Sequence, residues 1–247
     1  MTSVCAVIPV YDHEHAVGRM VEALRQQGLC VLLVDDGSGP SCAAELERLA
    51  NADAQVQLVR LPENQGKGVA VMTGLAAAAS AGFSHALQID ADGQHDPTDL
   101  PRFVAAAHAE PQSLVCGRPV FDASIPRHRF YFRYLTHALV WLNTLSFDIP
   151  DSMCGLRVYP LPVVLPILAA EPPGRRMEFD SEVLVRLYWR GVRMQWLPTR
   201  VRYPLDGVSH FRLVRDNWLI TRMHTRLFFG MLRRSPRLFA RKLGVSA

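Results

Sequence analysis

The chain has 247 residues, of which 49% are hydrophobic and 20% charged, enough to bury the core of one large α/β domain or of two small ones. Its net charge of +4 is unevenly spread, because residues 212–247 carry a net +8 and residues 1–211 a net −4. The five scattered cysteines contain no C-x-x-C pair, and no segment approaches the roughly 18 apolar residues of a membrane span. These features argue against a disulfide framework, a zinc site and a transmembrane protein. A strand begins almost at the first residue, leaving no room for a signal peptide, so we expect a cytoplasmic protein.

The first half of the chain alternates apolar runs with segments of helical spacing. Strands are predicted at Val4–Val10, Cys30–Val34, Val56–Arg60, 85–90 and Ser113–Cys116, and helices at His15–Gln27, 41–51, 69–81 and 98–109. This alternation predicts an α/β fold with a mostly parallel sheet and helices on both faces. The turn after the first strand has no glycine, which excludes the G-x-G-x-x-G motif of dinucleotide-binding folds. Gly66-Lys67-Gly68 likewise lacks the other residues of a P-loop.

The regular alternation stops after Arg118. Residues 126–147 begin with basic and aromatic side chains and continue with apolar ones, which is typical of an amphipathic helix. This helix packs on the sheet or, alternatively, contacts a membrane or a lipid acceptor. Further along, we expect a polar loop at Asp151–Arg157, a helix at Met177–Tyr188, and short strands at Val192–Leu197 and Val201–Tyr203.

From about residue 212 the pattern is helical again, with two rows of side chains. One row is basic and the other apolar: Arg215, Arg222, Arg226 and Arg233 against Ile220, Met223, Leu227 and Met231. We expect Pro236 to end this helix. The chain is therefore interpreted as one domain, residues 1–211, with a basic amphipathic appendage, residues 212–247. Such a segment indicates an anionic partner, either a membrane surface, a nucleic acid or a phosphorylated substrate.

In the stretch Leu87–Pro97, an apolar run is followed at once by carboxylates. Asp90 and Asp92 come at the end of the predicted strand, and ligands of open α/β sheets bind at that edge. Two carboxylates separated by one small residue suit Mg²⁺ or Mn²⁺, which take one or two protein carboxylates together with substrate phosphates. The alternative is a solvated acidic turn in which Asp96 or Thr98 caps the next helix.

Four motifs now stand in order along the chain, each at a predicted strand end or in a polar loop. They are Val34-Asp-Asp-Gly-Ser38, Asn64-Gln-Gly-Lys-Gly68, Asp90-Ala-Asp-Gly-Gln-His95 and Asp151…Gly155-Leu-Arg157. Together they resemble the family 2 glycosyltransferases, in particular the dolichyl-phosphate mannose synthase-like branch, over roughly residues 4–210. The resemblance implies a GT-A-type, Rossmann-like fold, a nucleotide-sugar donor, a divalent metal (Mg²⁺ or Mn²⁺) and inversion at the anomeric carbon.

The resemblance implies a nucleotide site at the ends of the first two strands. Pro9 and Tyr11 would flank the base. Asp36, or its neighbour Asp35, would accept a hydrogen bond from a ring N–H. The alternative for the two aspartates is to cap the helix that follows Pro40.

The resemblance also implies groups around the donor diphosphate. Asp90, Asp92 and Gln94 would hold the ribose and the metal, and the metal would stabilise the departing nucleoside diphosphate as a Lewis acid. Lys67 would approach the donor phosphate or sugar, unless it is a solvated loop lysine. Arg118 would bind phosphate, unless it forms a surface ion pair.

Two positions depart from the family pattern. The usual Asn-Glu pair after the first-strand tyrosine is Asp12-His13 here. Asp12 is therefore the candidate acid on the donor side, and the glutamate, Glu14, lies one residue further along the chain. Near the end of the domain, the family has an arginine, a glycine and a serine-lysine pair that would close over the donor phosphates. This chain has the same order, with His210 in place of the lysine: Arg202, Gly207, Ser209 and His210. A histidine is charged only part of the time near pH 7, which would make this clamp weaker or pH-sensitive.

The candidate catalytic residues are Asp92, at the metal, and three possible general bases: Asp180, Glu182 and Asp151. A sugar hydroxyl acceptor needs a carboxylate to take its proton, whereas a lipid phosphate acceptor is already an anion and needs none. Asp180 and Glu182 match the acidic helix start of the family. Their alternative role is simply to stabilise a helix N-terminus.

We therefore expect an inverting, metal-dependent glycosyltransferase that uses a UDP- or GDP-linked sugar. Its acceptor would be polyprenyl phosphate or another lipid-linked intermediate, and its C-terminal basic helix would hold it peripherally on an anionic membrane. Two alternatives remain at this point. One is a nucleotidyltransferase, which would require a glycine-rich basic loop after the first strand. The other is a non-catalytic module that would bind anionic partners through the C-terminal segment. Nucleic acid is not the expected partner, because few aromatic residues stand among the arginines of the tail.

Overall fold

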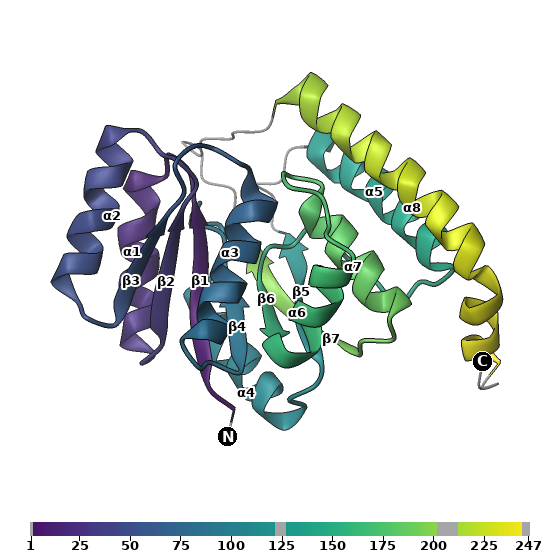
Figure 1. The fold of residues 1–247 in the computed structure, drawn as a ribbon, viewed down its shortest axis with the longest axis horizontal. Coiled ribbons are helices and arrows are strands. Elements are labelled where there is room, and N and C mark those ends of the chain that lie inside the picture. The colour runs from purple at the N-terminus through teal and green to yellow at the C-terminus, as the bar shows by residue number, and fades with distance from the viewer. Residues whose placement is uncertain (1, 122–126, 202–211, 244–247) are drawn as a thin grey trace.

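The computed structural model describes residues 2–121, 127–201 and 212–243. Within these ranges, seven strands form one sheet in the order β3-β2-β1-β4-β6-β5-β7 (Figure 1). All neighbouring strands run parallel except β6, which is antiparallel to both β4 and β5. The strands are β1 (Val4–Val10), β2 (Cys30–Asp35), β3 (Val56–Arg60), β4 (His85–Gln88), β5 (Leu114–Phe121), β6 (Arg157–Pro160) and β7 (Met194–Val201).

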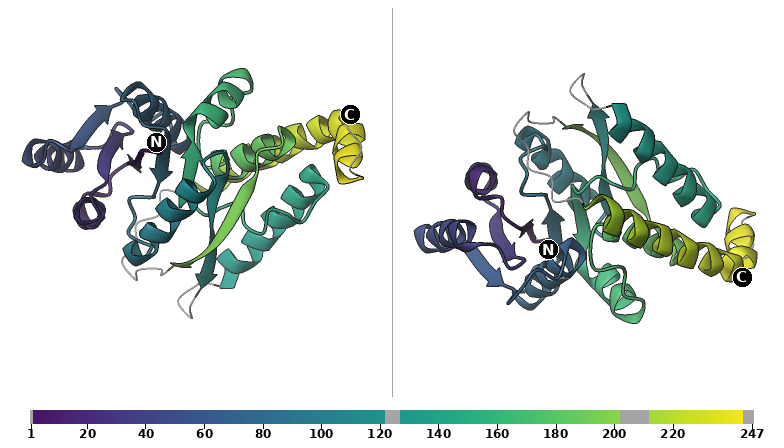
Figure 2. Two further views of the ribbon diagram at one scale, coloured as in Figure 1. Left: turned by 90° about the horizontal axis from the view of Figure 1, so that it is seen from below. Right: turned by 90° about the horizontal axis from the view of Figure 1, so that it is seen from above.

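Helices cover both faces of the sheet (Figure 2). They are α1 (Glu14–Gln26), α2 (Pro40–Ala52), α3 (Lys67–Ser80), α4 (Leu100–Ala109), α5 (Arg127–Thr144), α6 (Leu161–Ala170), α7 (Phe179–Trp189) and α8 (Leu213–Lys242). Successive residues of a strand face opposite sides of a sheet. Accordingly, Cys5 and Val7 of β1 join the core beneath α3, α6 and α7, whereas Ala6 and Ile8 join the core beneath α1, α2 and α4. The predicted α/β fold, with the five strands and four helices of the first half, is confirmed.

The region after β5 differs most from the prediction. The expected polar loop at Asp151–Arg157 ends in the antiparallel strand β6, and the helix α6 that follows has no counterpart in the predicted elements. Arg157 is fully buried at the start of β6, and its guanidinium donates to the backbone oxygens of Ser152 (3.0 Å) and Asp180 (2.8 Å). A buried charge is tolerated when it is hydrogen-bonded in this way. Helix α6 is almost uniformly apolar, so it shows no helical period.

The two short strands expected at Val192–Leu197 and Val201–Tyr203 are a single strand, β7, as far as Val201. It pairs in parallel with β5, which is also longer than predicted. Pro198 lies inside β7 but does not break it. Since β7 is at the edge of the sheet, a residue without an N–H is tolerated there.

Helix α8 packs against α5 and α7 and continues through Pro236 to Lys242, so the expected end at this proline is wrong. A proline at position 236 leaves the carbonyl of Leu232 without its helical N–H. The hydroxyl of Ser235 donates to that carbonyl at 2.9 Å and replaces the missing bond. The last turns lie at an angle to the rest of the helix (Figure 1). The predicted apolar row of α8 faces the protein: Ile220, Met223, Leu227 and Met231.

Candidate active site

The carboxyl ends of β1, β2 and β4 lie at one edge of the sheet, where the donor site is predicted. Asp12 follows β1 with a φ of +51°, a conformation that is uncommon for residues other than glycine. Its Oδ1 accepts a hydrogen bond from the N–H of Gly39 (2.7 Å), and its own N–H donates to Oγ of Ser38 (3.1 Å). Asp12 therefore ties the loop after β1 to the loop after β2. Pro9 and Tyr11 beside it are half-buried.

Asp36 fastens the loop that precedes α3. Its carboxylate is buried and accepts hydrogen bonds from the N–H of Gln65 (2.8 Å) and of Gly66 (2.9 Å). Burial raises the pKa of Asp36, although these two N–H groups oppose the shift. Both oxygens thus already have partners within the chain, so in this structure Asp36 positions the segment that carries Lys67.

Asp35 is equally occupied. It is buried, and it accepts hydrogen bonds from the N–H of Ser38 (2.8 Å) and from Nε of Arg60 (2.9 Å). Helix α2 begins after Gly39, which provides no side-chain cap. The alternative role of Asp35 and Asp36 as helix caps is therefore wrong.

Lys67, at the start of α3, bridges two carboxylates. Its Nζ lies 2.8 Å from Oδ1 and 2.9 Å from Oδ2 of Asp90, and 2.7 Å from Oδ2 of Asp180. Burial disfavours the ammonium, but Asp180 and Asp90 outweigh this effect and raise the pKa of Lys67 above its usual value. The side chain is only 15% exposed, so the alternative of a solvated loop lysine is wrong.

Asp92 lies close to Asp90 but forms no ion pair within the described part of the chain. Its Oδ1 accepts a hydrogen bond from the N–H of Gln94 at 3.0 Å, which turns the loop. Burial and the negative charge of Asp90 raise the pKa of Asp92. Lys67 lies between Asp90 and Asp180 and does not pair with Asp92, so a divalent cation beside Asp92 would supply the positive charge that it lacks. The expected capping by Asp96 is also present, because its Oδ1 accepts from the N–H of Thr98 at 3.0 Å.

The donor set fits a metal that also binds the substrate. Oδ1 of Asp90 is buried and lacks a well-aligned hydrogen bond. A Cβ on Gly155 would lie 2.2 Å from Oδ2 of Asp90, so the backbone there packs directly on this carboxylate. Across the described residues, no three His, Cys, Asp or Glu side chains gather to hold an ion by themselves. Mg²⁺ and Mn²⁺ sites of this kind take remaining ligands from phosphates and water.

Of the three candidate bases, only Asp180 reaches this cluster, through Lys67. Glu182 is completely buried, and its oxygens accept hydrogen bonds from Arg186 (2.6 Å), Arg226 (2.7 Å) and the N–H of Gly174 (2.8 Å). This carboxylate is surrounded by cations, an arrangement that holds helices α7 and α8 together.

Asp151 is the centre of a second buried ion pair. Arg133 donates to both of its oxygens, at 2.6 and 2.7 Å, and Nε2 of His137 lies 3.3 Å from Oδ2. Burial would raise the pKa of Asp151, but His137 and Arg133 outweigh it and hold the pKa well below the usual range. A carboxylate that holds its proton this weakly is a poor general base at neutral pH.

Three buried polar residues below the cluster have no predicted role. The hydroxyl of Tyr159 donates to Gln88 (3.0 Å) and accepts from Arg157 (3.2 Å), whose other bonds fix the backbone of Asp180. Burial raises the pKa of Tyr159 to about 12, so it remains a neutral donor. The only sequence features that could have indicated these residues are the polar Gln88 inside an apolar run and Arg157 at the end of the fourth motif.

The remaining predicted donor residues are placed as follows. Arg118 is exposed on β5 and forms no ion pair with the described residues, so the alternative surface pair is not observed. Arg202 and His210, with Gly207 and Ser209, lie outside the described residues.

Comparison with known proteins decides the family. The family model for glycosyl transferase family 2 matches residues 5–162. The chain belongs to this family. It is 28% identical over 204 residues to the polyprenol monophosphomannose synthase of Mycolicibacterium smegmatis, covering 75% of this chain and 71% of the relative. It is 25% identical over 195 residues to a UDP-N-acetylglucosamine–dolichyl-phosphate N-acetylglucosaminyltransferase of Methanococcus voltae, covering 72% and 77%.

The fold agrees with solved structures of glycosyltransferases. Glucosyl-3-phosphoglycerate synthase from Mycobacterium tuberculosis, crystallised with Mn²⁺, UDP-glucose and phosphoglyceric acid, superposes with a TM-score of 0.66 at 16% identity, covering 100% of this chain and 81% of that one. This family 2 glycosyltransferase thus has a GT-A-like fold and uses a nucleotide-sugar donor. The nucleotidyltransferase and binding-module alternatives are set aside.

Proposed function

We propose that this glycosyltransferase transfers a sugar from a UDP- or GDP-linked donor, with inversion, to a polyprenyl phosphate at a membrane surface. The observation that carries the proposal is the pair of carboxylates Asp90 and Asp92 after β4: Gly155 and Lys67 fix Asp90, and Asp92 forms no ion pair with a described residue and has a raised pKa. Relatives named for transfer to polyprenol and dolichyl phosphate support the acceptor class.

In this proposal Asp90, Asp92 and Gln94 hold Mg²⁺ or Mn²⁺, which when bound neutralises the donor diphosphate. Pro9 and Tyr11 flank the base of the nucleotide, and Asp12 and Asp35 belong to the same nucleotide-binding site. Asp36 supports the donor site indirectly, because it holds the segment that places Lys67. Arg118, Arg202 and His210 are proposed to bind the donor phosphates.

A phosphate acceptor agrees with the state of the candidate bases. Glu182 and Asp151 are paired with arginines in the interior, and Asp180 is paired with Lys67. None is a free carboxylate beside the donor site. An acceptor that is already an anion needs no proton removed before it attacks, so the reaction does not require one.

Membrane contact is proposed through the outer side of α8. The apolar row predicted to insert is packed in the protein, so we assign membrane insertion to a second row of α8, whose apolar side chains are exposed. Among the described helices, none is long and apolar enough to cross a bilayer. An amphipathic helix lying in the interface needs only apolar area and nearby cations. The exposed row consists of Val214, Trp218, Phe229, Leu232, Phe239 and Leu243.

Calorimetric titration with UDP and GDP, with and without Mn²⁺ or Mg²⁺, tests the donor site. We expect one nucleotide to bind in a metal-dependent way and Asp92→Asn to lose that dependence, because the variant keeps the shape but removes a charge. Glu22→Gln, an exposed change on α1, is the control and should bind as the wild type does. If neither UDP nor GDP binds under any of the metal conditions, the proposal is refuted.

A further inference from the structure

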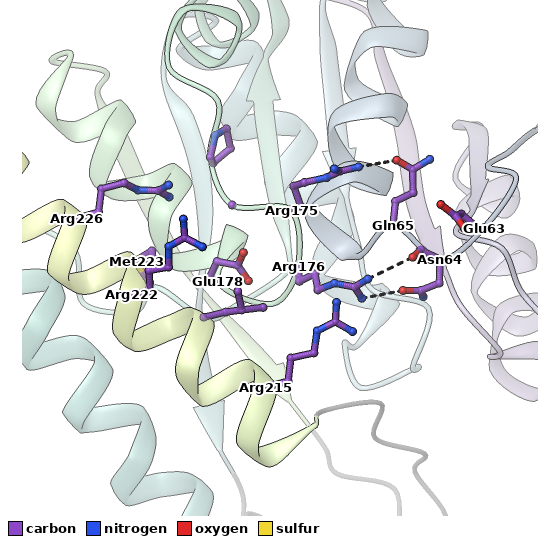
Figure 3. A pocket seen from close by; sticks show the side chains of 13 residues that line it. Glu63, Asn64, Gln65, Arg175, Arg176, Glu178, Arg215, Arg222, Met223 and Arg226 are labelled. Carbon is purple, nitrogen blue, oxygen red and sulfur yellow. Dashed lines mark hydrogen bonds between the residues drawn. The ribbon is translucent and has the colours of Figure 1, made fainter.

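A cavity of about 470 Å³ lies between α8, the loop before α3 and the segment that joins α6 to α7 (Figure 3). Its lining shares no residue with the Asp90–Asp92–Lys67 cluster. Five arginines line it, two from the α6–α7 segment and three from α8: Arg175, Arg176, Arg215, Arg222 and Arg226. We refer to this cavity as the arginine pocket.

Most of the arginines in the pocket form no ion pair with a described residue. Arg175 donates to Oε1 of Gln65 (2.7 Å), and Arg176 donates to Oδ1 (2.8 Å) and to the backbone oxygen (3.3 Å) of Asn64, which are all neutral acceptors. The guanidinium of Arg222 lies over the ring of Trp218, 5.5 Å from its centroid. Within the described ranges, only Arg226 among the five forms an ion pair, with Glu182.

Two carboxylates also line the pocket, and they restrict what it can bind. Glu63 is exposed. Glu178 is 7% exposed, and its Oε2 is buried without a hydrogen-bond partner. A buried acceptor of this kind requires a donor. A bare anion would satisfy the arginines but would leave Glu178 unsatisfied.

We propose that the arginine pocket is a second anion site, which binds a phosphate group with a hydroxyl or ammonium donor next to it. Guanidinium groups bind phosphate oxygens in pairs, which accounts for the arginines, and the neighbouring donor would bond to Glu178. Such a ligand has two sources, a phospholipid headgroup or a soluble phosphorylated compound. Trp218, which Arg222 contacts, belongs to the exposed row of α8, so the pocket adjoins the surface proposed to meet the membrane.

The pocket is also joined to the donor site. Gln65 and Asn64 accept hydrogen bonds from Arg175 and Arg176, and they belong to the loop in which the N–H groups of Gln65 and Gly66 donate to Asp36. A Cβ on Gly66 would lie 2.6 Å from the backbone oxygen of Arg175, so the two loops pack without space between them. A ligand that fixes the arginines therefore also steadies the segment that carries Lys67.

The test uses the full chain and two probes that share one chemistry. Glycerol 3-phosphate, titrated by calorimetry, represents the soluble source, and flotation with phosphatidylglycerol vesicles represents the lipid source. The pocket variant is Arg175→Gln with Arg222→Gln. The control is Arg19→Gln with Arg193→Gln, which removes the same charge from exposed positions outside the pocket and outside α8.

We expect the pocket variant to bind at least one probe about 100-fold more weakly, roughly tenfold for each arginine, while the control binds as the wild type does. Binding of glycerol 3-phosphate identifies a soluble ligand, and vesicle binding that this compound does not compete identifies a lipid. Glu178→Gln should weaken binding, and a gain of affinity would refute the role of the donor. Equal losses in both double variants, or no binding of either probe, would overturn the proposal. Metal-dependent nucleotide binding does not enter this test, so the two proposals fail independently.

Discussion

Gly155 confines Asp90, and its replacement by alanine tests whether the position of this carboxylate matters. A Cβ at residue 155 would lie 2.2 Å from Oδ2, 2.5 Å from Cγ and 2.6 Å from Oδ1 of Asp90. Comfortable contacts between heavy atoms begin near 3.5 Å, so the carboxylate has to shift by about 1 Å. Displacements of about 1 Å in a reactive site reduce turnover by roughly 100-fold. We expect a loss of this size in metal-dependent nucleotide binding and in sugar transfer.

The fold should tolerate the change, since the atoms in conflict belong to one partly exposed side chain. The assay is calorimetric nucleotide titration with and without Mn²⁺, together with thermal unfolding of the same preparation. Gly18→Ala on α1 is the control, because its Cβ would meet only Oε1 of Glu45 at 3.4 Å and alanine favours a helix by up to about 1 kcal/mol. Wild-type metal dependence in Gly155→Ala would show that Asp90 does not hold the metal.

Three further predictions concern stability. Asp151→Asn should lower the free energy of unfolding by about 3–5 kcal/mol in urea titrations, because Arg133 is left buried without its anion; a loss of turnover at unchanged stability would instead identify a general base. Burial lowers the pKa of His224 from 6.5 to about 4, so the folded state resists protonation and stability is lost as the pH falls through this window, by up to about 3 kcal/mol. His224→Gln should flatten that part of the profile of unfolding free energy against pH, and an unchanged slope would contradict the assignment. Asp36→Asn should cost about 1–3 kcal/mol and speed proteolysis before α3, since an amide offers one acceptor for the two N–H groups of Gln65 and Gly66; unchanged cleavage would argue against its anchoring role.

The sheet of the first half could be predicted because its strands are buried on both faces and therefore form unbroken apolar runs. Strand β6 could not be predicted, since it begins with Arg157, whose burial depends on the backbone oxygens of Ser152, in the preceding loop, and of Asp180, at the start of α7. The end of α8 could not be predicted from the sequence either. Pro236 breaks most helices, and here a single hydroxyl, on Ser235, replaces the missing bond.

The positions of the site residues could be predicted from strand ends, but their roles could not. Asp36 and Asp90 are the same residue type in similar situations, within two residues of the end of a buried strand. Asp36 has both oxygens on backbone N–H groups, whereas Asp90 faces Lys67 and keeps a buried oxygen without a well-aligned bond. The partners that separate a positioning residue from a candidate metal ligand come from α3 and from residue 155, which no local pattern connects to β4.

Helix α8 shows that a basic, amphipathic pattern does not identify its own partner. The apolar row that fits a membrane in sequence packs in the core, so its burial stabilises the fold instead. The arginines are divided as well: Arg226 is neutralised by Glu182 and Arg234 by Glu171, so less than the full charge of the segment faces outward. Two other arginines of α8, Arg215 and Arg222, line the arginine pocket. Membrane attraction therefore has to come from the exposed row and from the cations left unpaired, and a phosphate bound in the pocket would reduce that remaining charge.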